Sequence, residues 1–242
     1  MIIEYRAYTM KVGNLNKFYQ AQIDRGFDGV MAPLMQESLI GYFTTISGPV
    51  EQIIHLYSFN DLEEWRYRYD SIYSKDELLK YFHMVRPLIQ SQENTFLLPA
   101  PIKSIYSLFN KDNYWQRGDK PLADLKLFPS LLIEQQTISL LPGTLDKYWE
   151  AYEEYALQCL TPLETNQIGT FYTLVGSLHK VYHIRYFDDM PDKERRTNAV
   201  LMNPRWNEFL GRIQPLVISR DTKYMTPAPV KEMSPLFTIA NE

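Results

Sequence analysis

The chain has 242 residues, of which 45 % are hydrophobic and 22 % charged, and its formal net charge at pH 7 is −4. This composition is typical of a globular protein that can bury a sizeable core, and it excludes a disordered chain. Lys and Arg are scattered along the sequence, so we expect no nucleic-acid partner and no polybasic membrane-binding surface.

Cysteine usage and apolar patterning favour a reducing compartment. Cys159 is the only cysteine, which excludes an intramolecular disulfide and a structural zinc site built from cysteines. Met1 leads directly into a strand pattern instead of a secretory signal, and no apolar run reaches the ~20 residues of a membrane span. These features predict a soluble cytoplasmic protein.

The first predicted elements are a strand and a helix joined by a glycine turn. Residues 2–10 alternate between two faces, which is typical of a strand half buried on one side. Gly13 supplies the turn, and Asn14 is suited to be a helix N-cap. Helical spacing then begins at Leu15 and continues to about Asp24.

Three more strands and two helices follow in the first hundred residues. The strand patterns cover residues 39–46, 53–59 and 93–98. Asp61 is placed to cap one helix, and a second helix begins near Lys75 and ends near Pro87. The order strand, helix, strand, strand, helix, strand predicts the split β-α-β unit of the ferredoxin-like fold. In it the third strand lies between the first and the second, with the helices on one side.

The second half of the chain repeats the first. Residues recur at an offset of 130 that changes once to 128: Glu4 and Gly13 match Glu134 and Gly143, and Gly41, His55 and Pro87 match Gly169, His183 and Pro215. So many matches indicate an internal duplication. Polar residues from Lys111 to Pro121 interrupt the pattern. We therefore predict an α+β protein with ferredoxin-like units at 1–101 and 130–242 and a linker at 102–129, whose bare sheet faces pack together.

The repeated segments resemble the NIPSNAP family. The first unit matches through EYRAYTMKVG, LIGYFTT, IIHLYSF and VRPLIQSQENTFLLPAP, and the second through IEQQTISLLPG, IGTFYTL, VYHIRYF and NPRWNEFL. The resemblance implies two tandem ferredoxin-like units packed as an intrachain dimeric α/β barrel, and it implies no settled activity. The chain looks more like bacterial members, since it has no Arg-rich transit segment. Other barrels of this fold include cofactor-free monooxygenases, polyketide cyclases and haem-handling proteins, which is an analogy of fold alone.

Candidate site residues lie on the first and third strands of each unit. By alternation His55 shares a face with Tyr57, and His183 with Arg185. We expect the other, apolar faces to meet the helices, so that the histidine faces point between the two sheets. The predicted catalytic residues are His55, His183, Glu4 and Glu134, and the predicted ligand-binding residues are Arg6, Tyr8, Tyr57, Gln136 and Arg185.

The predicted chemistry is acid–base. A histidine would transfer a proton, a carboxylate would orient its ring, and an arginine would hold an anionic substrate. In the alternative interpretation, the same side chains form a buried hydrogen-bond network between the sheets, because buried polar groups must pair. The two units differ at two of these positions: Gln136 replaces Arg6, and Arg185 replaces Tyr57. This difference would let one half of the chain bind a ligand while the other half supports it structurally.

No metal or cofactor is predicted. His179 and His183 are four residues apart on a predicted strand, which would place them about 13 Å apart, too far to share an ion. The sequence has no P-loop, G-x-G-x-x-G, G-x-S-x-G or H-E-x-x-H motif. Cys159 lies in an apolar helical stretch and is interpreted as a buried, inert thiol.

Two functional hypotheses stay open. In the first, a barrel pocket handles a small aromatic or amphipathic molecule, as a binder or as a cofactor-independent enzyme. In the second, the protein is a non-catalytic interaction or scaffold module. A ligand-sized pocket beside either histidine favours the first, whereas a filled interior with a broad apolar surface patch favours the second. A homo-oligomer is compatible with both.

Overall fold

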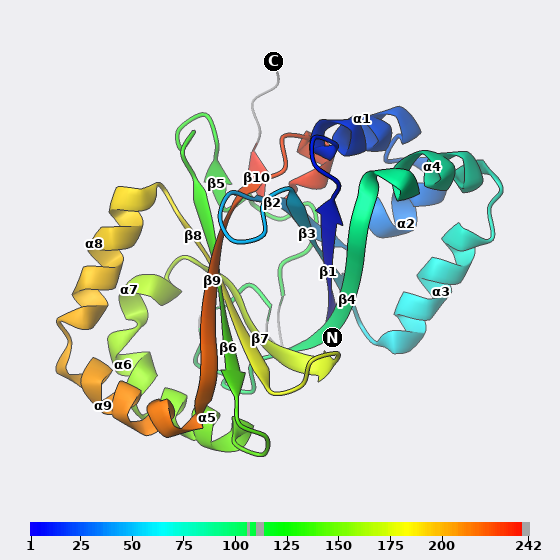
Figure 1. Cartoon of the computed structure of the whole chain (residues 1–242). Helices are drawn as coiled ribbons and strands as arrows, with labels where there is room; N and C mark the ends of the chain where they lie inside the picture. The colour runs from blue at the N-terminus through cyan, green and yellow to red at the C-terminus, as the bar shows by residue number, and fades with distance from the viewer. Residues whose placement is uncertain (106, 110–113, 239–242) are drawn as a thin grey trace. The chain divides into compact units, whose positions relative to one another are not determined.

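The computed structural model of the chain describes residues 1–105, 107–109 and 114–238 (Figure 1). The chain divides into two units. Unit 1 comprises Met1–Phe96, Gln116–Leu127 and Met225–Glu242, and unit 2 comprises Leu97–Trp115 and Phe128–Tyr224. Both units therefore take residues from the predicted linker, of which Tyr106 and residues 110–113 (including Lys111) lie outside the described residues.

Unit 1 has the order of strands and helices that the sequence predicts. With the short helices η1 (Gly29–Met31), α2 (Ala32–Met35) and η2 (Arg86–Leu88), its elements are β1 (Ile2–Met10), α1 (Leu15–Arg25), β2 (Leu39–Thr45), β3 (Gln52–Phe59), α3 (Leu62–Tyr73), α4 (Glu77–Val85) and β4 (Ile89–Pro99). β4 begins at Ile89 instead of residue 93, because its first half is polar and exposed and gives no apolar alternation. Helices α1, α3 and α4 lie on one side of these strands (Figure 1).

The predicted place of the third strand in unit 1 is confirmed. β3 pairs antiparallel with both β1 and β2. The register places Arg6 opposite His55 and Glu4 opposite Tyr57. Since side chains of paired residues on neighbouring strands share a face, these four lie together on one face of the sheet. The short strands β5 (Ala123–Asp124) and β10 (Phe237–Thr238) form a separate parallel pair in unit 1.

Unit 2 repeats this arrangement. Its elements are β6 (Leu132–Leu140), α5 (Leu145–Ala151), η3 (Tyr152–Ala156), α6 (Leu157–Cys159), α7 (Thr161–Glu164), β7 (Gln167–Val175), β8 (Lys180–Phe187), α8 (Met190–Leu201), α9 (Pro204–Ile213), η4 (Gln214–Leu216) and β9 (Val217–Pro227). β8 pairs with β6 and β7, with Gln136 opposite His183 and Glu134 opposite Arg185. The expectation that His179 lies on the strand is wrong: it precedes β8 in a bend, with φ of 59°.

The eight long strands follow the hydrogen-bonding order β1-β3-β2-β9-β6-β8-β7-β4 of a closed barrel. β4 and β9 carry the chain from the residues of one unit into those of the other, at Phe96 to Leu97 and at Tyr224 to Met225. The last residues of β9 pair with β2 in unit 1, where Thr44 lies opposite Thr226. The expected barrel is thus confirmed as a mixed α/β fold with a closed eight-stranded sheet.

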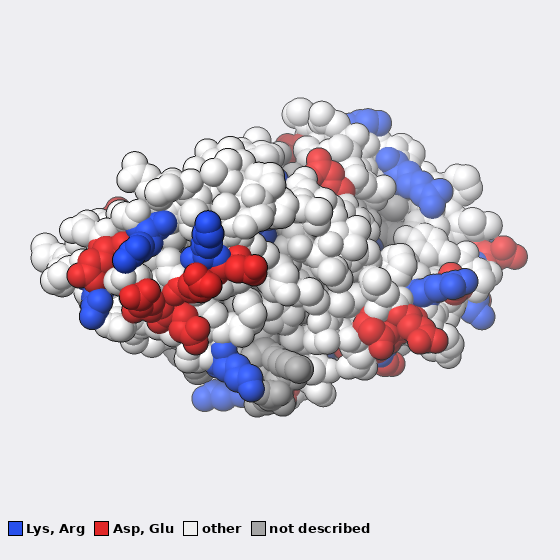
Figure 2. Space-filling view, turned by 90° about the horizontal axis from the view of Figure 1, so that it is seen from below, with Lys and Arg blue, Asp and Glu red and all other residues white. Residues whose placement is uncertain are grey.

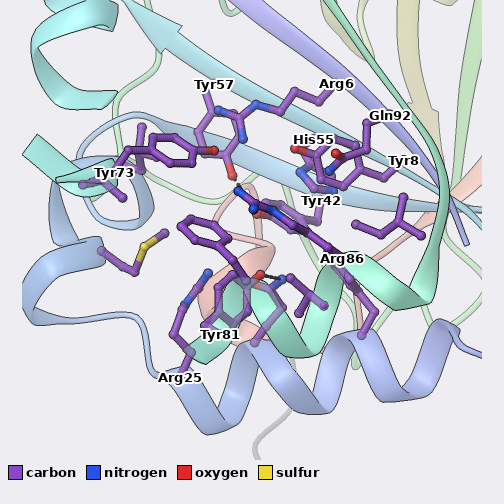
Figure 3. Close-up of a pocket in the computed structure, with 18 residues that line it drawn as sticks. Arg6, Tyr8, Arg25, Tyr42, His55, Tyr57, Tyr73, Tyr81, Arg86 and Gln92 are labelled. Atoms are coloured by element: carbon purple, nitrogen blue, oxygen red, sulfur yellow. Dashed lines mark hydrogen bonds between the residues drawn. The ribbon is translucent and has the colours of Figure 1, made fainter. Parts of the chain in front are cut away.

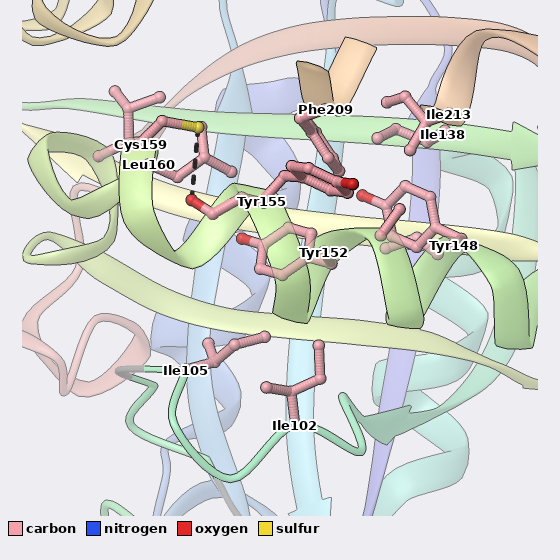
Figure 4. Close-up of a cluster of buried hydrophobic side chains, with 14 of the residues drawn as sticks. Ile102, Ile105, Ile138, Tyr148, Tyr152, Tyr155, Cys159, Leu160, Phe209 and Ile213 are labelled. Carbon is pink, nitrogen blue, oxygen red and sulfur yellow. Dashed lines mark hydrogen bonds between the residues drawn. The ribbon is translucent and has the colours of Figure 1, made fainter. Parts of the chain in front are cut away.

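The helical core of unit 2 is built on the helix that follows β6 (Figure 4). Tyr148 and Tyr152 are fully buried in it and pack against Phe209 of α9. A π-helical turn, η3, interrupts the helix from Tyr152 onward; such turns often occur at functional sites. Cys159 is buried, as the sequence predicts, and burial raises the pKa of its thiol, which disfavours the reactive thiolate.

The N-terminal caps of α3 and α8 give a first test of the fold. The Asp61 carboxylate accepts a hydrogen bond from the Glu64 amide at 2.8 Å, and Asp189 accepts one from Asp192 at the same distance. We expect Asp61→Ala to lower the free energy of unfolding by about 1 kcal/mol in urea denaturation. Asp61→Asn, which keeps the acceptor, should retain most of it; equal losses in both variants would argue against the cap.

Candidate functional site

A cavity of about 120 Å³ lies in unit 1 between the sheet and the helices (Figure 3). The strands contribute Arg6, Tyr8, Tyr42, His55 and Tyr57 to its wall. The helices contribute mainly aromatic and aliphatic side chains. The expectation that the His55 face points away from the helices is therefore wrong. Both faces of β3 are rich in apolar or aromatic residues, so polarity did not distinguish them.

His55 is the centre of this wall. Its side chain is buried, and its ring stacks on Tyr42 with centroids 3.8 Å apart and tilts against Tyr8 at 4.5 Å. Neither ring nitrogen has a hydrogen-bond partner among the described residues. Burial, and then the charges of Arg6 and Arg25, lower the pKa of His55 well below its usual range. The ring is therefore neutral at pH 7 and offers one donor and one acceptor.

The cavity in unit 1 is cationic. Arg6, Arg25 and Arg86 line it, and none of its described lining residues is Asp or Glu. Arg6 is neutralised by Glu4, whose Oε2 lies 3.0 Å from its Nη2. The Nε of Arg25 donates to the Gly26 carbonyl, but its buried Nη2 has no partner within the described part of the chain. An anion in the cavity would supply the missing acceptor.

Glu4 does not orient His55, contrary to the prediction. Its carboxylate binds Arg6, the Tyr69 hydroxyl at 3.1 Å and the Asn94 amide at 2.8 Å. Tyr57 shares a 2.6 Å hydrogen bond with Tyr42. Burial raises the pKa of both phenols, which keeps them neutral. Arg6, Tyr8 and Tyr57 thus lie at the cavity as expected, whereas Glu4 acts on Arg6.

The equivalent histidine in unit 2 has a different environment. His183 Nε2 lies 2.9 Å from the Tyr148 hydroxyl, and Nδ1 lies 3.1 Å from the Thr170 hydroxyl. Its ring also stacks on Tyr152. Burial, followed by Arg185 and Arg220, lowers the pKa of His183 well below its usual range. Since both nitrogens are satisfied, His183 fits the alternative of a structural hydrogen-bond network.

The duplication explains this difference. At offsets of 130 and 128, Tyr148 corresponds to Phe18 and Thr170 to Tyr42. Phe18 has no hydroxyl, and the Tyr42 hydroxyl bonds to Tyr57 while its ring stacks on His55. Both hydrogen-bonding groups around His183 are therefore absent around His55. Aligning the two halves at the positions around the histidines would have revealed this from the sequence.

The other predicted residues of unit 2 line a second cavity. Glu134 lies 3.5 Å from Arg185 and 3.8 Å from Lys193, and Gln136 is on the same wall. One buried carboxyl group was missed: Glu164 accepts a 2.6 Å hydrogen bond from Tyr152, and burial raises its pKa. Glu164 follows Pro162 in a short helix, where no local pattern indicates a buried acid.

Metal ligands and surface charges are the other features that could form a site. Within residues 1–105, 107–109 and 114–238, no group of three or more His, Cys, Asp and Glu side chains could hold a metal ion. No helix in the described ranges is both long and apolar enough to cross a membrane. On the face shown in Figure 2, acidic and basic side chains lie close to one another instead of forming a large field of one sign. The cavities are therefore the strongest candidate sites.

Comparisons with known proteins identify relatives. The NIPSNAP family model matches residues 3–103 and 133–231. The chain is 23 % identical to protein NipSnap homolog 2 of Danio rerio over 78 % of its length and 22 % identical to the Homo sapiens homolog over 78 %. It spans 59 % and 60 % of these relatives.

Solved structures with low sequence identity share the fold. A candidate monooxygenase of Lactobacillus acidophilus superposes with a TM-score of 0.56 at 10 % identity, over 93 % of both chains. An anthrone oxidase-like protein has a TM-score of 0.56 at 10 % identity, over 94 % of this chain and 91 % of that one. These likenesses concern the fold alone.

Proposed function

This chain belongs to the NIPSNAP family, whose activity is unsettled, and from that premise we propose that the cavity of unit 1 binds a small, planar, anionic molecule. One observation carries the proposal: His55 is a buried polar side chain at the cavity wall with both ring nitrogens unpartnered among the described residues. Leaving such groups without partners is costly, which favours a ligand that completes them.

The size and walls of the cavity indicate the kind of ligand. An engineered cavity of ~150 Å³ accommodates benzene, so about 120 Å³ encloses at most a single small ring, and the substituents of a larger ligand would require the side chains of the wall to shift. Tyr8, Tyr73 and Tyr81 supply flat surfaces around it. A carboxylate or phenolate would bind Arg25, and a ring hydroxyl would bond to His55. A hydroxylated aromatic acid combines all three features.

Proton transfer is the chemistry that this site supports. The lowered pKa of His55 makes the empty site a weak base, but an anion bound beside the ring would raise that pKa, so that His55 could accept a proton from a hydroxyl or an acidic C–H while Arg25 stabilises the resulting anion. This supports a cofactor-independent enzyme as a form of the first hypothesis. The names of the monooxygenase and anthrone oxidase-like neighbours are consistent with it. The cavity beside each histidine weighs against the scaffold hypothesis.

The proposal is tested by calorimetric titration of 2-hydroxybenzoate, with phenol as the uncharged comparison. Arg25→Gln and His55→Leu are each expected to weaken binding by about tenfold or more, because each removes a hydrogen bond in a desolvated site. Arg66→Gln is the matched control, since it removes a positive charge from an exposed residue outside the cavity. Equal affinities in wild type, Arg25→Gln and His55→Leu would reject the site.

The organisation of the chain belongs to the same proposal. The two family matches and the repeated order of elements support tandem ferredoxin-like units at 1–101 and 130–242. A cytoplasmic location, a bacterial origin and the absence of a nucleic-acid partner stay predictions. So does a homo-oligomer, which light scattering after size-exclusion chromatography would detect.

A further inference from the structure

Unit 2 contains a cavity that differs in size and lining from the cavity of unit 1. Its volume is about 270 Å³, more than twice that in unit 1. Polar side chains from β6, β8, α8 and β9 line one part, and apolar side chains from the helices line the rest. The volume and charge follow from substitutions between the two repeats.

Smaller side chains open the space beside Glu134. In unit 1, the equivalent Glu4 is enclosed by hydrogen bonds from Arg6, Tyr69 and Asn94. The corresponding positions in unit 2 carry the shorter residues Gln136, Thr197 and Thr222, all of which line the cavity. Loss of an arginine, a tyrosine ring and an asparagine leaves room that a ligand can occupy.

Cations replace neutral residues around the same space. Tyr57, Trp65 and Gln92 of unit 1 correspond to Arg185, Lys193 and Arg220 of unit 2. These three cations line the cavity with a single carboxylate, that of Glu134. Arg185 is 3 % exposed, and its Nε has no partner among the residues that the structure describes. The excess of positive charge and the unpartnered donor favour a ligand with an anionic head group.

The remaining wall is more apolar than its counterpart. Tyr8, Tyr73 and Tyr81 of unit 1 correspond to Ile138, Leu201 and Phe209. Val200 and Trp206 lie on the same wall. Apolar surface of this kind is covered favourably by a hydrocarbon chain. By comparison with the ~150 Å³ cavity that holds benzene, the space suits a hydrocarbon of about ten carbon atoms.

We propose that unit 2 holds a second ligand site, which binds an amphipathic aliphatic carboxylate. The carboxylate would lie among Arg185, Lys193 and Arg220, and the chain against Leu201, Trp206 and Phe209. This site is separate from the one at His55 and does not depend on it. Its ligand differs in chemistry because apolar residues stand in unit 2 where unit 1 has tyrosines, and cations stand where unit 1 has neutral side chains.

The test is calorimetric titration of decanoate, with 1-decanol as the uncharged comparison. Saturable decanoate binding is expected in wild type, weakened at least tenfold in the double variant Lys193→Gln/Arg220→Gln. Arg205→Gln, an exposed α9 residue outside the cavity, is the matched charge control and should bind as wild type. Absence of saturable binding, or equal affinity in wild type and the double variant, would overturn the proposal.

A second variant tests the space independently of charge. Thr197→Tyr restores the residue found in unit 1 and should fill the cavity, which we expect to reduce decanoate affinity at least tenfold. Thermal unfolding verifies that this variant is folded. Wild-type affinity in folded Thr197→Tyr, or loss of decanoate binding in His55→Leu, would place the ligand elsewhere and reject the site.

Discussion

Replacing His183 by leucine is expected to lower the free energy of unfolding by about 3 kcal/mol, whereas the same change at His55 should alter it by no more than about 1 kcal/mol. His183 bonds to the buried hydroxyls of Tyr148 and Thr170. Leucine would remove both bonds and leave the Tyr148 hydroxyl desolvated without this partner. An unsatisfied buried group costs about 1–3 kcal/mol.

His55 has no such bond to lose. Its removal costs the stacking on Tyr42 and Tyr8, about 0.5–1.5 kcal/mol for an aromatic pair, but it also removes two desolvated polar nitrogens. These terms oppose each other. Urea denaturation of the two leucine variants, with equal slopes verified, measures the difference. Similar losses at the two positions would mean that His55 has a structural partner and would weaken the proposed ligand site.

The order of elements was predictable because it depends on local patterns. Period-two alternation marked β1, the aspartate cap marked α3, and the repeat carried both assignments into unit 2. The pairing of β3 with β1 and β2 followed from the order of elements. That pairing brings Arg6 beside His55 and Glu134 beside Arg185, and the observed strand registers agree with it.

The direction of the histidine faces was not predictable from the same patterns. Alternation separates the two faces of β3 but does not say which one the helices cover, and here the covered face carries Tyr57 and His55. The long-range hydrogen-bond partners of Glu4 could not be predicted from local sequence patterns either. Tyr69 and Asn94 reach Glu4 from α3 and β4, far along the chain, so that Glu4 binds Arg6 instead of orienting the histidine.

Lowering the pH from 7.5 to 5 is expected to destabilise the protein, by at most about 2 kcal/mol for each buried histidine. Burial, and then Arg6 and Arg25, lower the pKa of His55; burial, and then Arg185 and Arg220, lower that of His183. In the unfolded chain a histidine has a pKa of about 6.5. Between that value and the folded pKa, only the unfolded state binds the proton, so acid favours unfolding.

The full stability is therefore present above about pH 6.5 and is lost as the pH falls toward the folded pKa of each histidine. Glu164 works in the opposite direction, because burial raises the pKa of its carboxyl group and the folded state gains its proton first. Glu164 therefore adds to the free energy of unfolding at low pH, and this addition is lost as the pH rises through the raised pKa of its carboxyl group. Urea denaturation at a series of pH values gives the slope, and His55→Leu should reduce it by about half, since one of two titrating histidines is removed. An unchanged slope in His55→Leu would show that His55 takes up its proton equally in the folded and unfolded states. That result would contradict the lowered pKa expected from its burial beside Arg6 and Arg25.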